Sequence, residues 1–247
     1  MPGTLEPAPS RTLPRLFVIG DSISLHYGPF LEMYVAGSFQ YARKRDEARG
    51  SGASLDYPSG AFGENAGDSG MVLEYLRANR TPGCTMPADD VTDRGVGRAR
   101  LPADVVLLNC GLHDLKTDPA TARPQVALDQ YRENLRAIAA LVTDEPYQAV
   151  WITTTPVHDQ THAAHRAELG FTRNQADVER YNAAATAVML EAGIPVADLH
   201  AFTRALSVAA SAGIYADHVH FVDGVRQAQA AFLAGWLSGA WSGLRRS

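Results

Sequence analysis

Short apolar runs alternate with longer amphipathic segments along most of this chain, and this alternation narrows the choice of folds. The amphipathic segments repeat apolar residues at helical spacing, as Tyr131, Leu135, Ile138 and Val142 do. Runs that are apolar at every position are typical of strands buried on both faces of a parallel sheet. The alternation therefore predicts an α/β fold of three layers, α/β/α, with helices on both faces of the sheet. Five segments are the expected strands: 16–19, 39–43, 105–109, 150–154 and 194–198.

Length and composition indicate one domain. The 247 residues show no break in composition, so we expect a single domain over 16–247, preceded by a flexible lead-in at 1–15 that holds four prolines and no apolar core of a signal peptide. The net charge of −5, with mixed signs, argues against a nucleic-acid partner. No stretch approaches the roughly 18 apolar residues of a membrane span. We expect a cytoplasmic protein in which Cys84 and Cys110 are free thiols.

A serine follows the first apolar run. Residues 16–24 read Leu-Phe-Val-Ile-Gly-Asp-Ser-Ile-Ser, so Ser22 comes just after the strand and opens a helix that carries Tyr27 and Leu31. Ligands bind at the carboxyl ends of the strands in open parallel sheets. The N–H of Ser22 is then a free helix-terminal donor, placed to favour negative charge. Ser22 is a candidate nucleophile, although a serine at this position is also a common helix cap.

A carboxylate and two imidazoles lie together near the end of the chain, in Asp217-His218-Val219-His220. The spacing of Asp217 and His220 lets the carboxylate hold Nδ1–H of the imidazole, which leaves Nε2 to take the proton of Ser22. Tyr215 stands three residues before His218 and cannot orient it in this way. We expect His220 to be the base, with His218 as the competing candidate.

These two regions resemble the motifs of the SGNH/GDSL hydrolase family, and the resemblance covers about residues 16–241. It rests on Gly-Asp-Ser at 20–22 and on Asp-x-x-His at 217–220 followed by Phe-Val-Asp-Gly at 221–224. The resemblance implies the SGNH hydrolase fold, with a flavodoxin-like, five-stranded parallel sheet. It also implies a catalytic triad of Ser22, His220 and Asp217. We expect no cofactor and no bound metal.

The same family supplies three donors to the oxyanion of the reaction: the serine N–H, a glycine N–H and an asparagine from a Gly-x-Asn-Asp block. By resemblance the glycine is Gly67, in Glu-Asn-Ala-Gly at 64–67. The third block reads Gly-Leu-His-Asp at 111–114, which matches a subgroup that also carries Thr-Thr-Thr-Pro-Val, here at 153–157. We therefore expect Ser22, Gly67 and His113 to form the oxyanion hole. Asn109 is the alternative donor, and a buried His113 satisfied by Asp114 is the structural alternative.

A second Gly-Asp-Ser occurs at 67–69 and is superficially similar to the serine motif of chymotrypsin-like proteases. Those enzymes place their His and Asp upstream of the serine, whereas only His26 among the histidines precedes Ser69. The Gly-x-Ser-x-Gly elbow of the α/β-hydrolases is also missing from the sequence. We expect Ser69 to play no nucleophilic role.

Three histidines fall on one face if residues 158–165 are helical: His158, His162 and His165. Such spacing can bind zinc, but no Glu follows His158 in the His-Glu-x-x-His manner. A metal-dependent hydrolase built on this cluster is one rival interpretation, and a polar rim beside the site is the preferred one. In the next segment, Arg173 is a candidate substrate clamp and Asn174 a candidate helix cap.

The resemblance implies a serine esterase that works through an acyl-enzyme. The loops at 80–100 and 158–173 are polar and charged, whereas a long-chain lipase exposes apolar surface at its mouth. We therefore expect a small-molecule or carbohydrate ester with a short acyl group, such as acetyl. The alternatives are a thioesterase or lysophospholipase of the same family, and a non-catalytic carbohydrate-binding protein. The further candidates for substrate binding are Asp21, Asn65, Asp114 and Arg173.

Overall fold

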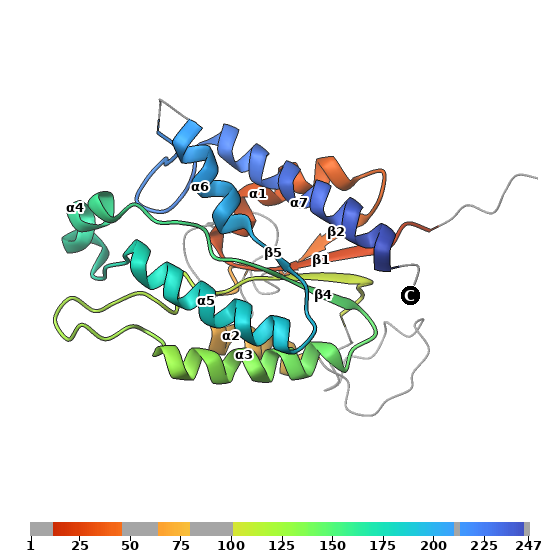
Figure 1. Ribbon diagram of the computed structural model, residues 1–247, viewed down its shortest axis with the longest axis horizontal. Helices are drawn as coiled ribbons and strands as arrows, with labels where there is room; N and C mark the ends of the chain where they lie inside the picture. Colours follow the sequence, from red (N-terminus) through yellow and green to blue (C-terminus); the bar gives the residue numbers. More distant parts are fainter. Residues whose placement is uncertain (1–11, 46–63, 80–100, 210–212, 245–247) are drawn as a thin grey trace, which may run out of the picture.

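The computed structural model of the protein describes residues 12–45, 64–79, 101–209 and 213–244 (Figure 1). Five strands form one sheet in the order β2-β1-β3-β4-β5, and every neighbouring pair is parallel. This is the flavodoxin-like order, so the predicted sheet is confirmed. The strands are β1 (Arg15–Ile19), β2 (Gln40–Arg43), β3 (Val105–Leu108), β4 (Gln148–Ile152) and β5 (Val196–Ala197).

The observed strands differ from the predicted ones mainly at β4 and β5. Strand β4 begins and ends two residues earlier than expected, and β5 holds two residues instead of five. The backbone of Thr154 bonds to a side chain instead of a strand: its N–H donates to Asn182 Oδ1 and its carbonyl accepts from Asn182 Nδ2, both at 2.8 Å. The predicted strand thus extends two residues too far, over Thr153 and Thr154, which follow the end of β4.

Helices cover both faces of the sheet, as the alternation predicts (Figure 1). Helix α1 packs against α7, which also packs against α6, while α3 packs against α2 and α5 on the other face. Helix α4 lies beyond the end of the sheet, at the left of Figure 1. The helices are α1 (Ser22–Val35), α2 (Ser69–Ala78), α3 (Leu128–Thr143), α4 (Asp159–Leu169), α5 (Gln175–Glu191), α6 (Leu199–Ala209) and α7 (Asp223–Leu244).

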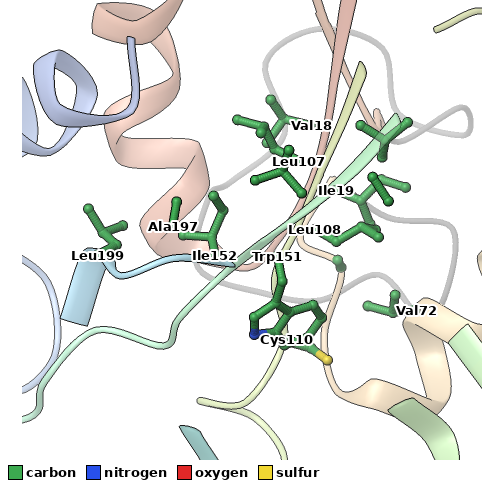
Figure 2. Close-up of a cluster of buried hydrophobic side chains, with 14 of the residues drawn as sticks. Val18, Ile19, Val72, Leu107, Leu108, Cys110, Trp151, Ile152, Ala197 and Leu199 are labelled. Atoms are coloured by element: carbon green, nitrogen blue, oxygen red, sulfur yellow. The ribbon is translucent and has the colours of Figure 1, made fainter. Parts of the chain in front are cut away.

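The core lies between the sheet and these helices. Figure 2 shows Leu107 and Leu108 of β3 beside Val18 and Ile19 of β1, with Trp151 of β4 close by. All five side chains are buried. Strands with adjacent buried residues require cover on both faces, which explains why their sequences do not alternate between apolar and polar.

Several predictions concern residues outside the described ranges. These are most of the lead-in at 1–15, the loop at 80–100 and Cys84. Cys110 is buried and free. Across the described ranges, no helix is both long enough and apolar enough to cross a membrane.

Candidate active site

Ser22 is the first residue of α1, three residues after the last residue of β1 and directly after a Gly-Asp turn. The helix cap is Asp21, whose Oδ1 accepts the N–H of Ile23 at 3.0 Å, so the cap considered for Ser22 belongs to its neighbour. The Ser22 hydroxyl is therefore not used to cap the helix. Only 9% of Ser22 is exposed, which places the hydroxyl in a recess rather than on an open surface.

The structure brings Ser22 together with two side chains that lie almost 200 positions further along the sequence, Asp217 and His220. His220 Nε2 is 2.8 Å from Ser22 Oγ, and His220 Nδ1 is 2.6 Å from Asp217 Oδ2. The second oxygen of Asp217 accepts the backbone N–H groups of Val219 and His220 at 2.8 and 2.7 Å. One carboxylate thus shapes the turn and orients the imidazole that the turn carries.

The charge of Asp217 fixes the proton positions of this relay. Burial alone raises the pKa of Asp217, but the hydrogen bonds from His220 and from the backbone outweigh it and hold the pKa below its usual 3.8. The carboxylate is ionised at neutral pH, so Nδ1 of His220 carries the proton that it donates. Nε2 is then the acceptor for the hydroxyl of Ser22.

Two other histidines border the relay without joining it. His218 Nδ1 is 3.9 Å from Asp217 Oδ1, too far for a hydrogen bond, and its ring lies against His162 at 4.8 Å. The structure therefore pairs Ser22 with His220 and not with His218. The ring of His26 packs 4.5 Å from that of His220, a contact that sequence analysis missed because His26 belongs to no motif.

His113 lies beside the relay in a defined tautomer. It is buried, and Lys116 Nζ lies 3.1 Å from its Nδ1. Burial, and then the charge of Lys116, lower the pKa of His113 well below 6.5, so the ring is neutral. Because an ammonium only donates, Nδ1 must accept, and the ring proton is on Nε2. His113 can donate through Nε2–H.

The alternatives considered for this block fit the structure less well. Asn109 donates its amide to the Ile152 carbonyl at 2.9 Å and so is committed to strand β4. Asp114 does not satisfy His113, because both of its oxygens accept the N–H of Ser69, at 2.9 and 3.1 Å. This geometry contradicts the interpretation in which His113 is a structural residue that is hydrogen-bonded to Asp114.

Gly67 adopts the left-handed conformation that favours glycine, with φ of 72°. Its N–H donates to Asn65 Oδ1 at 3.0 Å. The expected oxyanion donor therefore already has an acceptor in this structure. The two neighbouring candidates for substrate binding, Asn65 and Asp21, are buried and bonded to the backbone, so the structure gives both a local structural role.

The second Gly-Asp-Ser forms the start of helix α2. Asp68 Oδ1 caps the helix by accepting the N–H of Met71 at 3.0 Å, and Asn134 donates to Ser69 Oγ at 2.9 Å. Ser69 is fully buried. It holds the helix in place and has no imidazole as hydrogen-bond partner among the described residues.

The three histidines of the proposed metal cluster do not converge. His158 precedes α4 and contacts Thr161 Oγ1 at 2.7 Å, His165 contacts the Thr161 carbonyl at 2.9 Å, and His162 is buried. Within the part of the chain that the structure describes, no group of three or more His, Cys, Asp or Glu side chains is arranged to hold a metal ion. This weighs against the metal-dependent alternative.

The segment after α4 places Arg173 near the relay. Its Nε donates to the Leu112 carbonyl at 2.6 Å, one residue before His113. Asn174 caps α5 by accepting the N–H of Asp177 at 2.8 Å, as one reading of the sequence expected.

Comparison with known proteins identifies the type of fold. No family model and no curated protein matches the chain. Among solved structures it is similar to a lipase/acylhydrolase from Enterococcus faecalis, at 14% identity and a TM-score of 0.61, covering 92% of this chain and 97% of that one. It is also similar to an acetyl xylan esterase, at 14% identity and a TM-score of 0.60, covering 90% and 99%. A GDSL-like lipase from Bacteroides thetaiotaomicron aligns at 13% identity and a TM-score of 0.55, covering 92% and 88%. The chain therefore has the fold of the SGNH/GDSL hydrolases.

Proposed function

We propose that the protein is a serine esterase of the SGNH/GDSL type that hydrolyses short-chain esters through an acyl-enzyme. The observation that carries this proposal is the relay from Ser22 Oγ through His220 to Asp217, at 2.8 and 2.6 Å, in a fold shared with acylhydrolases. A hydroxyl, an imidazole in the correct tautomer and an ionised orienting carboxylate are what nucleophilic acyl transfer requires.

In the first half-reaction, Ser22 Oγ attacks the ester carbonyl and its proton moves to His220 Nε2. The tetrahedral intermediate collapses when the bond to the alcohol oxygen breaks, and His220 Nε2–H protonates the departing alkoxide. In the second half-reaction, His220 takes a proton from water, whose oxygen attacks the acyl carbonyl. The acid then leaves, and Ser22 regains its proton from His220.

We assign the negative charge of the tetrahedral intermediate to the N–H of Ser22 and Nε2–H of His113. The Ser22 N–H lies at the start of α1, and the tautomer of His113 set by Lys116 supplies a donor of the required kind. Gly67 N–H is the third donor, shared between the oxyanion and Asn65 Oδ1, because it is bonded to Asn65 in this structure.

We further propose an acetyl ester of a carbohydrate or a similar polar alcohol as substrate. Polar and cationic side chains border the relay: His113, Lys116, Arg173 and His218. A similar structure of nearly equal length is an acetyl xylan esterase, which supports a small acyl group on a polar carrier.

The test is hydrolysis of 4-nitrophenyl acetate by the purified protein. Ser22→Ala should lower kcat by on the order of 10⁶-fold, whereas Ser69→Ala, which alters the other Gly-Asp-Ser, should retain most of the activity. A fluorophosphonate probe should label Ser22, located by peptide mass spectrometry. No labelling and no turnover would favour the non-catalytic carbohydrate-binding alternative, and loss of activity with a chelator would favour the metal-dependent one.

A further inference from the structure

Arg173 is buried beside the relay with part of its guanidinium unpaired. Only 6% of the residue is exposed, and its Nε donates to the Leu112 carbonyl at 2.6 Å. Within the described part of the chain, neither Nη group has a hydrogen bond or an ion-pair partner. Neither Nη atom is among the polar atoms that are fully buried without a partner, so both reach solvent, where an anionic ligand can pair with them.

A second cation lies near Arg173. Arg173 Cζ and Lys116 Nζ lie 4.8 and 5.1 Å from the centroid of the same ring, that of Phe171. Burial, and then the charge of Arg173, lower the pKa of Lys116 to about 8. Two like charges held close to one aromatic ring repel each other, and an anion bound near both relieves this repulsion.

Three carboxylates interact electrostatically with this pair. Asp21 and Asp217 are the two whose charges raise the pKa of Arg173, although burial has the larger effect and lowers it to about 10. Asp21 caps α1 through Oδ1, while its Oδ2 is buried without a hydrogen-bond partner, and Asp217 holds His220. The third is Asp68, whose charge raises the pKa of Lys116 and whose oxygens accept the N–H of Met71 and the amide of Gln125. Among the described residues, none of these three carboxylates forms an ion pair with Arg173 or Lys116.

The location ties these cations to the reaction. Lys116 Nζ contacts Nδ1 of His113, and Arg173 contacts the carbonyl of the residue just before it. After burial, the charge of Arg173 is also among the causes that lower the pKa of His113, His162 and His218. The cationic pair thus lies next to His113, the proposed oxyanion donor, with Lys116 on the Nδ1 side of its ring, rather than on a remote surface.

We propose that Arg173 and Lys116 form a subsite for an anionic group, a carboxylate or a phosphate, carried by the ester substrate. This inference rests on the proposed esterase function. Because the proposed acyl group is acetyl, which has no room for a second functional group, the anion belongs to the alcohol portion. The Nη groups of Arg173 suit a bidentate contact with two oxygens, and Lys116 adds a point charge.

The experiment compares matched esters that differ in charge by one methyl group: 4-acetoxybenzoate and its methyl ester. Each kcat/KM is divided by the rate of hydrolysis of that ester by hydroxide, which removes the electronic effect of the methyl group. The anionic ester should be preferred by about ten- to a hundredfold, the range of a hydrogen bond to a charged group. In Arg173→Gln this ratio should fall to near one. Arg180→Gln, which changes an exposed arginine of α5 paired with Asp177, should keep the wild-type ratio.

Three further measurements test the same proposal. A phosphate in place of the carboxylate, in 4-acetoxyphenyl phosphate, shows which anion the subsite prefers. If Arg173→Gln does not fold, Lys116→Gln and inhibition of the wild type by 4-hydroxybenzoate against its methyl ester report the same preference. A preference that appears only with the carboxylate on the acyl side, in mono(4-nitrophenyl) succinate against its methyl ester, overturns the assignment to the alcohol.

The failures of the two proposals are distinguishable. Hydrolysis of both acetoxybenzoate esters at equal normalised rates, or a ratio that survives in Arg173→Gln, overturns the anionic subsite and leaves the esterase intact. If neither acetoxybenzoate ester nor 4-nitrophenyl acetate is hydrolysed, the esterase proposal and the subsite proposal are overturned together.

Discussion

Replacing Asp217 by asparagine tests the relay most sharply, because the geometry predicts a change in proton position with little change in fold. In the wild type one oxygen of Asp217 accepts two backbone N–H groups, and the other accepts Nδ1–H of His220. The asparagine must keep its carbonyl oxygen on the backbone donors, so its NH₂ group faces His220. Two donors cannot face each other, and the ring proton of His220 moves to Nε2. Ser22 Oγ then meets an N–H instead of a base.

The expected losses differ greatly between activity and stability. A triad histidine held in the wrong tautomer loses about 10⁴-fold in kcat, or about 5 kcal/mol of barrier. The fold loses only the difference between charged and neutral hydrogen bonds at one turn, about 2 kcal/mol. For a domain of this size that corresponds to a fall of about 4–8 °C in Tm.

The assay is hydrolysis of 4-nitrophenyl acetate together with thermal unfolding followed by circular dichroism. Asp223→Asn is the matched control, since Asp223 is an exposed carboxylate six residues away that pairs with Arg226 at 2.9 Å, and it should stay within about twofold of the wild type. An Asp217→Asn variant that retains more than a tenth of the wild-type activity refutes the assignment of the orienting role. A variant that is unfolded at the assay temperature refutes the argument that the turn survives.

Three further predictions concern the surroundings of the relay. His113→Ala should lower kcat about 10²–10³-fold with little change in KM, measured with 4-nitrophenyl acetate, and a loss below tenfold removes this residue from the oxyanion hole. The preference for the anionic over the neutral ester should decline as pH rises through about 8. Burial lowers the pKa of Lys116 to about 8, and the charge of Lys116 is lost above that value. An equal preference at pH 7 and pH 9 contradicts this prediction. For Asp114, burial outweighs the hydrogen bonds from Ser69 and raises the pKa from 3.8 to about 7, so the folded state binds more protons between pH 4 and 7. The free energy of unfolding of the wild type should therefore fall relative to Asp114→Asn across that window, by about 1.4 kcal/mol per pH unit, and urea titrations that show a constant difference refute the shift.

The sheet was predictable because its strands obey a physical rule that leaves a mark in the sequence. A strand covered on both faces needs apolar side chains at consecutive positions, and Val105–Leu108 is buried throughout. The ends of the strands were harder to place. The turn at Thr154 depends on Asn182, a residue 28 positions away whose amide replaces a strand neighbour, and nothing local to Thr154 signals this.

Within the candidate site, predictability follows the range of the interaction. The contact between Asp217 and His220 spans three residues, so spacing alone indicates it. The neutral tautomer of His113 depends on Lys116, also three residues away, but the sequence gives no sign that both side chains point the same way. The place of Arg173 depends on the Leu112 carbonyl, 61 positions away, which only the assembled fold supplies.

The meeting of Ser22 with His220 follows from how the fold arranges two helices. Ser22 opens α1 at the carboxyl end of β1, and α7 begins three residues after His220. These two helices pack side by side on one face of the sheet, so their first turns lie close together at the same edge (Figure 1). The nucleophile and its base therefore depend on the packing of α1 against α7 and not on the connection between them.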